Sequence, residues 1–290
     1  MALASNLSRK DFLRGLGLAL ATPFLTKLEA GPRATMKKVG LQLYTLRNEL
    51  PKDLEGTLKK VSEIGYKELE TFGYADGKFF GKTPKEFKSL IAGMGMSSPS
   101  GHYMPANLKA DWSRAVDHAA ELGQKYMMCA FLFPNERKTL DDYKRFAELF
   151  NQSGEVAKKA GIQFGYHNHD FEFQAIDGQL PYDILLKQTD PKLVKMELDL
   201  YWTVFAGKDP IELFKQHPGR FPLVHLKDMA KTEKREFAEV GTGSINFQRI
   251  LDARKTAGIE HFFVEQDAVV KGTPMEAIAV SYANVQKLSV

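Results

Sequence analysis

The sequence AKKAGIQFGYHNH, residues 157–169, shows most clearly the repeating unit from which the fold can be recognised. It ends a helix-like pattern at Ala160, places Gly161 where a helix C-terminus favours glycine, and continues into a short apolar strand. The strand ends in the polar run Tyr166-His167-Asn168-His169. A helix, a glycine, a strand and then polar side chains at the strand's carboxyl end are typical of one unit of a β/α protein.

The same pattern recurs along the chain from Lys38 onward. Apolar residues spaced three and four apart predict helices with one buried face, and several of these helices end at a glycine before the next strand. Eight such units in about 255 residues fit a (β/α)8 TIM barrel better than a doubly wound sheet, whose Gly-rich first turn is missing here. We therefore predict an α/β fold with a single TIM-barrel domain at residues 36–290. The strands are expected at residues 39–44, 66–70, 98–103, 126–132, 162–169, 194–202, 221–228 and 261–267.

The composition is that of a folded globular protein. Hydrophobic residues make up 43% and charged residues 26% of the 290 residues. The 40 Lys and Arg against 36 Asp and Glu leave a net charge of +4. Part of that charge lies in the first 38 residues, so the body of the chain lacks a basic surface for nucleic acid. The one cysteine, Cys129, excludes an internal disulfide, and its apolar neighbours predict that it is buried.

The first 35 residues differ from the rest of the chain. Ser8-Arg9-Lys10-Asp11-Phe12-Leu13-Arg14 is a basic run, and the weakly apolar residues 15–21 that follow are too few to span a bilayer. The run resembles a twin-arginine export signal in which Lys10 replaces the second arginine. We expect segment 1–35 to direct export to the periplasm or beyond and then to be removed, leaving nothing stably inserted in a membrane. An amphipathic N-terminal helix on a cytoplasmic protein is the alternative.

Polar residues close the last four predicted strands, where a TIM barrel places its active site. Ionisable side chains within apolar strands are costly unless they are paired or bound to a metal. The four strand ends can supply a His, an Asp, a second His and a Glu. These two imidazoles and two carboxylates suit Mn²⁺, Co²⁺, Zn²⁺ or Fe²⁺ better than Mg²⁺, so we predict a site for one divalent ion. Because side chains on a strand alternate between two faces, four pairs each share a face. The pairs are His167 with His169, Glu197 with Asp199, His225 with Lys227, and Glu265 with Asp267.

These strand ends resemble those of a known family. The runs YHNH (166–169), LD (198–199), VHLKD (224–228) and VE (264–265), with GYKELE (65–70), are similar to sugar phosphate isomerases/epimerases of the xylose isomerase-like barrel type, which include inosose dehydratases. The resemblance covers the chain from about Lys38 to its end. It implies one divalent ion bound by residues on strands five to eight, which here are His167, Asp199, His225 and Glu265. Histidine takes the first position, where many epimerases have a glutamate that also acts as an acid/base.

Other residues near the predicted barrel mouth have two interpretations each. Glu70 and His102 close the second and third strands and are expected to bind substrate hydroxyls or move a proton, although a helix-cap or surface role fits them equally well. Lys227 is expected to polarise a substrate oxygen, and together with Glu265 and His169 it forms the predicted catalytic set.

Two loops are also ambiguous. Asp170 and Glu172 are either substrate contacts or loop charges. The run GTGSINF (241–247) either holds a phosphate on its backbone N–H groups or forms a turn in which Ser244 or Asn246 caps the next helix. We favour the cap, because no phosphate-binding lysine follows the glycines.

A divalent ion at the mouth of such a barrel is typical of enzymes that remove a proton beside a carbonyl through a metal-stabilised enediolate. Return of the proton gives isomerisation or epimerisation, and loss of a β-oxygen substituent gives elimination. We predict a divalent-metal-dependent sugar isomerase/epimerase acting on a small sugar or keto-sugar. The alternatives are a keto-sugar dehydratase or lyase and a non-catalytic metal-dependent sugar-binding barrel. The near-neutral body disfavours an apurinic endonuclease, and a homo-oligomer stays possible.

His167 affects the choice between these products. An imidazole in place of a carboxylate removes one negative charge beside the ion and one proton carrier. Epimerisation needs an acid/base on each face of the reacting carbon. With Glu265 as the one clear carboxylate base, the opposite face would depend on His169, Glu70 or His102. The sequence therefore favours isomerisation or β-elimination over epimerisation.

Overall fold

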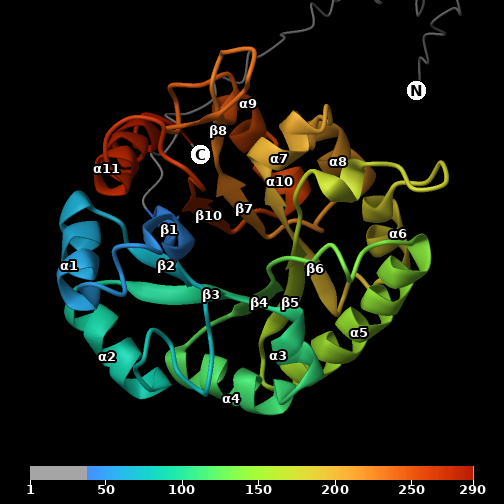
Figure 1. Ribbon diagram of the computed structural model, residues 1–290, viewed down its shortest axis with the longest axis horizontal. Coiled ribbons are helices and arrows are strands. Elements are labelled where there is room, and N and C mark those ends of the chain that lie inside the picture. Colours follow the sequence, from blue (N-terminus) through green and yellow to red (C-terminus); the bar gives the residue numbers. More distant parts are fainter. Residues whose placement is uncertain (1–37, 290) are drawn as a thin grey trace, which may run out of the picture. The chain divides into compact units, whose positions relative to one another are not determined.

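Eight parallel strands close into a barrel in the computed structural model, which describes residues 38–289 (Figure 1). Neighbouring strands pair in the order β1-β10-β7-β6-β5-β4-β3-β2, so the first and last strands of the chain meet and close the barrel. The predicted TIM barrel is confirmed. The predicted export segment, 1–35, lies outside the described residues. The barrel strands are β1 (Gly40–Gln42), β2 (Glu68–Thr71), β3 (Ser97–Tyr103), β4 (Tyr126–Cys129), β5 (Gln163–His167), β6 (Val194–Asp199), β7 (Leu223–Leu226) and β10 (His261–Val264).

Helices surround the barrel and cover the outer faces of its strands (Figure 1). Threonine side chains at residues 83, 139 and 273 close capping boxes at three helix N-termini. Gly161 and Gly258 follow helices and have φ of 73° and 81°, which explains the glycines before the strands. No described helix has the length and apolar character needed to cross a membrane. The longer helices are α1 (Leu54–Ile64), α2 (Pro84–Gly93), α4 (Trp112–Leu122), α5 (Leu140–Lys159), α6 (Pro181–Gln188), α8 (Pro210–Gln216) and α11 (Pro274–Val285), and the shorter ones are η1 (Leu43–Leu46), α3 (Pro105–Lys109), η2 (Phe171–Phe173), α7 (Leu200–Phe205), α9 (Phe247–Asp252) and α10 (Arg254–Ala257).

Most strands end earlier than the sequence predicts. The predicted strand 194–202 stops at Asp199, because the Asp199 carboxylate accepts a hydrogen bond from the Trp202 backbone N–H (2.9 Å) and starts α7. The predicted strand 39–44 stops at Gln42, whose side chain accepts from the Tyr44 N–H (3.0 Å). The predicted strand 221–228 stops at Leu226, and Asp228 belongs to a small antiparallel ribbon of β8 (Asp228–Met229) and β9 (Phe237–Ala238). Polar side chains at the strand ends capture backbone N–H groups and so end the parallel pairing.

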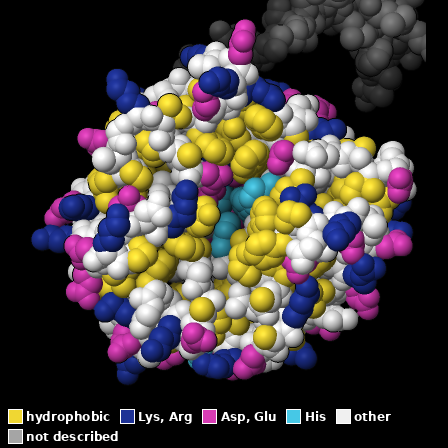
Figure 2. Space-filling view, in the orientation of Figure 1, with side chains coloured by type: hydrophobic (Ala, Val, Ile, Leu, Met, Phe, Trp, Pro, Cys, Tyr) yellow, Lys and Arg dark blue, Asp and Glu magenta, His cyan; other side chains and the backbone are white. Residues whose placement is uncertain are grey.

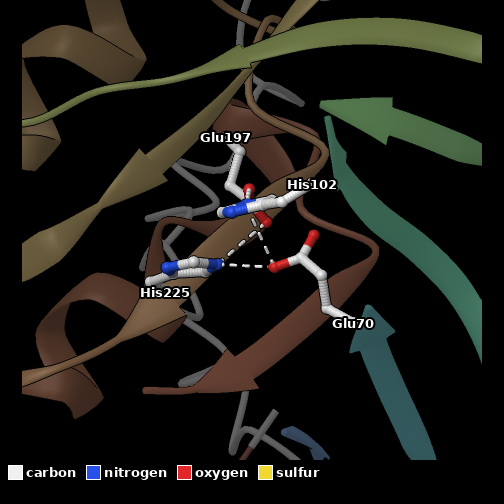
Figure 3. A group of neighbouring side chains, drawn as sticks. All are labelled: Glu70, His102, Glu197 and His225. Carbon is white, nitrogen blue, oxygen red and sulfur yellow. Dashed lines mark hydrogen bonds and ion pairs between the residues drawn. The ribbon is translucent and has the colours of Figure 1, made fainter. Parts of the chain in front are cut away.

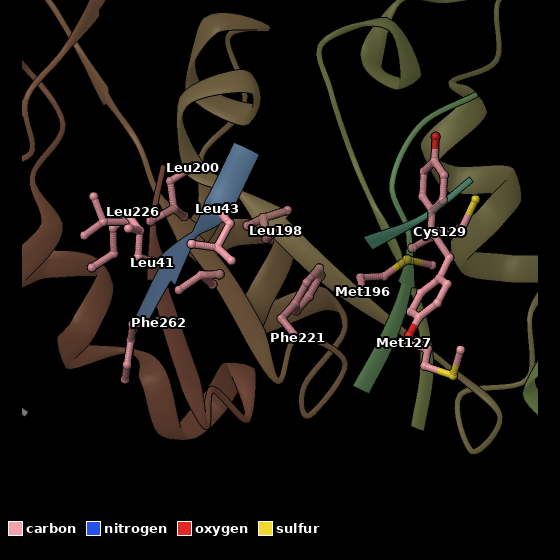
Figure 4. Close-up of a cluster of buried hydrophobic side chains, with 14 of the residues drawn as sticks. Leu41, Leu43, Met127, Cys129, Met196, Leu198, Leu200, Phe221, Leu226 and Phe262 are labelled. Atoms are coloured by element: carbon pink, nitrogen blue, oxygen red, sulfur yellow. The ribbon is translucent and has the colours of Figure 1, made fainter. Parts of the chain in front are cut away.

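The barrel interior has an apolar lower layer. Tyr126, Met128, Leu223 and Phe263 pack together there and are buried. Glycine makes room for them, because a Cβ on Gly165 would lie 2.3 Å from the Met128 sulfur. The outward faces of the same strands pack against the helices, and Figure 4 shows part of this cluster, including Leu41, Leu198 and Leu226. Cys129 is buried, as predicted.

The loop 241–247 is built around the carboxylate of Asp228. Asp228 Oδ2 accepts hydrogen bonds from the backbone N–H groups of Gly241 and Gly243 (both 2.9 Å), and Oδ1 accepts from Ile245 (3.1 Å). The N–H groups that a phosphate would need are therefore occupied. Asn246 accepts from the Arg249 N–H (3.0 Å) and caps α9, so the favoured interpretation of this run as a helix cap is confirmed.

We expect Asp228→Ala to lower the free energy of unfolding by about 2–4 kcal/mol, because several backbone donors lose a charged acceptor at once. Asp228→Asn keeps one oxygen acceptor and should lose less. Urea unfolding of the two variants and the parent measures the difference. A loss for Asp228→Ala of only about 0.5 kcal/mol, as for an ordinary surface substitution, would contradict this account.

Candidate active site

Four predicted ligand residues meet at the carboxyl end of the barrel. His167 ends β5, Asp199 ends β6, His225 lies in β7, and Glu265 follows β10. We call them the four-strand cluster. His167 Nε2 lies 3.1 Å from His225 Nδ1, and that nitrogen lies 2.9 Å from Glu265 Oε2. His167 Nε2 is also 3.5 Å from Asp199 Oδ2. One donor atom from each residue falls within 4.8 Å of the others, so the structure brings the set together.

The four-strand cluster suits a cation. Asp199 uses Oδ1 for the α7 cap, while its buried Oδ2 accepts no well-aligned hydrogen bond and lies 3.3 Å from the Lys227 ammonium and 3.5 Å from His167 Nε2. A buried carboxylate oxygen without a well-aligned donor is costly, and a metal ion would lower that cost. Two imidazole nitrogens and two carboxylates match a borderline divalent ion. The residues present therefore fit the predicted metal.

A second group lies beneath the first, and Figure 3 shows it. We call Glu70, His102, Glu197 and His225 the floor cluster. His225 Nε2 lies 2.7 Å from Glu70 Oε2, and His102 Nε2 lies 2.7 Å from Glu197 Oε2. His225 thus directs one ring nitrogen to the floor and the other to the four-strand cluster. A hydrogen bond from Nε2–H to Glu70 orients the ring, and Nδ1, which lies 2.9 Å from Glu265 Oε2, can bind a metal ion once it has lost its proton.

Glu70 has a different position from the one expected of a substrate-binding residue. Its carboxylate is fully buried and accepts from Gln42 Nε2 (2.7 Å) and Ser100 Oγ (2.6 Å) as well as contacting His225. It does not line the cavity, whereas His102 does. Burial lowers the pKa of His102, but Glu70 and Glu197 outweigh that effect and the net shift is upward. The two carboxylates of the floor cluster, Glu70 and Glu197, therefore orient His225 and His102.

Lys227 is enclosed by carboxylates. Its ammonium lies 2.7 Å from Asp267 Oδ2, 2.9 Å from Glu265 Oε2 and 3.3 Å from Asp199 Oδ2. Burial lowers the pKa of Lys227, but the three carboxylates outweigh it and hold the pKa well above its usual value. An ammonium with three donors and three acceptors has none left for a substrate. The structure thus places Lys227 beside the candidate ligands and away from the cavity lining.

His169 lines the cavity and is neutral near neutral pH. Burial, then the charges of His167 and Lys227, hold its pKa well below the usual value. Its ring stacks on Phe171 at 5.3 Å, and its buried Nδ1 has no hydrogen-bond partner. The indole Nε1 of Trp202, whose ring lies 5.7 Å from His169, is also buried without a partner. Because His169 lines the cavity, its unpartnered Nδ1 is available to a ligand there.

Glu172 is a buried structural residue and is not among the residues that line the cavity of the site. It is fully buried, and its carboxylate accepts hydrogen bonds from the His169 backbone N–H (2.8 Å) and the Tyr166 hydroxyl. The expectation of a substrate contact or a loop charge is therefore wrong for Glu172, because the short helix η2 turns it inward. Burial raises the pKa of Glu172 to about 7. Asp170 remains on the surface side and accepts from Gln174 Nε2 (2.9 Å).

The sequence missed two contributors to this site. Glu197 was paired with Asp199 on one face, but its role as a partner of His102 depends on contacts across the barrel between β6 and β3. Gln42 gave no signal as a single amide in an apolar strand. Above these residues lies a cavity of about 580 Å³, and Figure 2 shows histidines at the bottom of a hollow surrounded by hydrophobic side chains.

Comparison with known proteins agrees with the barrel fold. A family model described as xylose isomerase-like TIM barrel matches residues 58–275. The chain is 34% identical to a sugar phosphate isomerase/epimerase from Parabacteroides distasonis, with a TM-score of 0.76, over 89% of this chain and 97% of that one. It also has the fold of the IolI protein, solved with a bound zinc atom, at 16% identity and a TM-score of 0.66 over 85% of this chain and 96% of that one.

Inosose dehydratases are also similar. The enzyme from Clostridium perfringens is 25% identical over 270 residues, which cover 83% of each chain. The enzyme from Geobacillus thermodenitrificans is 29% identical over 151 residues, or 46% of this chain, and the match spans half of that relative's length.

Glu172 should make stability depend on pH. The folded state holds the Glu172 proton up to about pH 7, whereas the ordinary pKa is 4.5, so ionisation between these values favours unfolding. We expect the free energy of unfolding of the parent, relative to Glu172→Gln, to fall by about 3 kcal/mol across that interval. Urea unfolding at several pH values measures this, with Asp170→Asn as the control. A difference that stays constant or rises with pH would contradict it.

Proposed function

Because this chain belongs to the xylose isomerase-like TIM-barrel family, we propose that it is an enzyme that removes a proton beside the carbonyl group of a sugar. The observation that carries the proposal is the four-strand cluster beneath a cavity lined by His167, His169 and Glu265. The relatives named isomerase/epimerase and inosose dehydratase support this class of reaction. The substrate, the metal and the product are part of what we propose.

The candidate ligands for a divalent ion are His167, Asp199, His225 and Glu265. When bound, such an ion supplies a Lewis acid for the carbonyl oxygen of the sugar. Glu70 fixes the ring of His225, as described above. Lys227 holds Glu265 and Asp267 in place, so that the carboxylates do not rotate toward solvent.

Proton transfer falls to residues that face the cavity. Glu265 uses Oε2 for both His225 and Lys227, which leaves Oε1 as its free oxygen. His169 is neutral, lines the cavity and has an unpartnered nitrogen. A second base on the opposite face would have to be His169 or His102, because the Glu70 carboxylate is occupied by its own hydrogen bonds.

Two products are compatible with one base. Isomerisation returns the proton to a neighbouring carbon, and the Parabacteroides distasonis relative, named an isomerase/epimerase, supports this outcome. β-Elimination expels an oxygen substituent, and the relatives named inosose dehydratases support that one. Both reactions begin with the same proton abstraction and differ in their products, so one experiment that identifies the products separates them.

The first prediction from the proposed function concerns metal binding. Asp199→Ala and His225→Ala should lower the affinity for Mn²⁺ or Zn²⁺ by orders of magnitude, because each leaves three ligands. Glu70→Ala should lower it by about 10- to 100-fold, because His225 loses the partner that orients it. Metal titration followed by elemental analysis measures affinity and stoichiometry, with Asp170→Ala as the control. Unchanged affinity in both Asp199→Ala and His225→Ala would exclude this cluster as the metal site.

The second prediction concerns the reaction. Metal-loaded protein is incubated in deuterated water with a panel of ketoses and keto-glycosides, and NMR and mass spectrometry follow the products. We expect deuterium beside the carbonyl, together with an isomer or an eliminated product, and loss of both after chelation. Inversion at one carbon without either product would reveal a second base. Sugar binding without deuterium incorporation would show a non-catalytic barrel.

A further inference from the structure

The outer part of the cavity is aromatic, unlike its polar floor. Tyr44, in η1, and Phe133, just after β4, are 41% and 45% exposed, and both line the cavity with Phe72 and Phe131. Within residues 38–289, four large hydrophobic side chains are exposed, and two of them are at this one opening. Figure 2 shows hydrophobic side chains on both sides of the hollow. We call these four aromatic residues the aromatic rim.

Each side of the aromatic rim is held in place by other groups. The Tyr44 ring packs edge-on against Phe72 at 5.3 Å, and the Arg47 guanidinium lies 4.4 Å from the Tyr44 centroid. Arg47 also donates to the Asp267 carbonyl oxygen (2.6 Å), which ties this side to the residues after β10. On the other side Phe133 packs edge-on against Phe131 at 5.5 Å. The rings are therefore positioned before any ligand arrives, which lowers the entropy cost of binding.

The two ends of the cavity suit different parts of one ligand. The bottom of the cavity is lined by polar side chains that match hydroxyl and carbonyl groups, namely His102, His167, His169 and Glu265. The rim offers mainly aromatic faces, which attract the C–H face of a sugar ring or another aromatic ring. A single sugar bound at the floor would leave the rim exposed to water, and an exposed apolar patch on a soluble protein usually marks a binding surface.

We propose that the aromatic rim is a second subsite, which binds a ring joined by a glycosidic bond to the reacting sugar. The substrate class is then a glycoside whose reacting ring keeps a carbonyl group, that is, a keto-glycoside or a reducing disaccharide, with either a second sugar or an aromatic group as the outer ring. A free monosaccharide lacks the contacts with the rim. This inference rests on the sugar chemistry proposed above and adds the part of the substrate that lies outside the reacting ring.

The test is equilibrium binding, which does not require turnover. Isothermal titration of the Mn²⁺-loaded protein compares methyl and phenyl glycosides of glucose, galactose and mannose, and compares each free sugar with a disaccharide that contains it. We expect the phenyl glycoside or the disaccharide of at least one sugar to bind about tenfold more tightly than its small counterpart. Preference for the phenyl glycoside identifies an aromatic outer ring, and preference for the disaccharide identifies a second sugar.

Variants assign the preference to the rim. Tyr44→Ala and Phe133→Ala should bring the ratio of the two dissociation constants toward one, whereas Tyr44→Phe and Phe133→Tyr keep a ring and should keep the ratio. Val280→Ala, at an equally exposed residue on α11 that does not line the cavity, is the matched control. Equal binding of small and ring-bearing ligands, no binding of any glycoside, or a preference that survives both alanine variants would overturn the subsite. Deuterium incorporation into a free ketose would still support the proposed reaction in each of these cases.

Discussion

The structure depends on carboxylates that are buried inside the barrel. Glu70, Glu197 and Asp199 are fully buried and Glu265 is 4% exposed, while a single buried ammonium, Lys227, lies among them. Burying a carboxylate in a protein costs roughly several kcal/mol unless opposite charges and hydrogen bonds replace the water it loses. Here Lys227, three histidines, Gln42 and Ser100 replace it only in part. The remaining negative charge and the poorly satisfied Asp199 Oδ2 are the features on which the proposal of a divalent cation rests.

The apolar layer below makes that arrangement rigid. Met128, Leu223 and Phe263 fill the lower barrel, and Gly165 gives them the space they need. Water is thereby kept from the underside of the floor cluster, so its hydrogen bonds act in a medium of low dielectric constant. His225 links the floor cluster to the four-strand cluster, because its Nε2 contacts Glu70 and its Nδ1 faces the other candidate ligands. The packing of the core therefore also supports the geometry of the site.

The cavity above the floor changes character along its depth. Histidines and carboxylates at the bottom suit the reacting part of a sugar, and Tyr44 and Phe133 at the opening suit an apolar ring face. The family shares the barrel, and the resemblance seen in the sequence implies a glutamate in many epimerases at the position of His167. The loops that carry Tyr44 and Phe133 are where members of one fold can differ most in the substrates they accept.

The barrel and the four-strand cluster could be predicted from the amino-acid sequence. Strand and helix periods are local, and parallel strands in a barrel bring their carboxyl ends together, so His167, Asp199, His225 and Glu265 could be assigned from their places at strand ends. The tertiary structure decided what each remaining side chain contacts. Glu70 and Glu172 were misplaced because burial and partner choice depend on residues far away in the chain, such as the contact between Glu70 and His225. Strand ends were too long because Asp199 and Gln42 capture backbone N–H groups, an event that apolar periodicity does not report. The aromatic rim was invisible for the same reason, since Tyr44 and Phe133 become neighbours of one cavity only when the barrel closes.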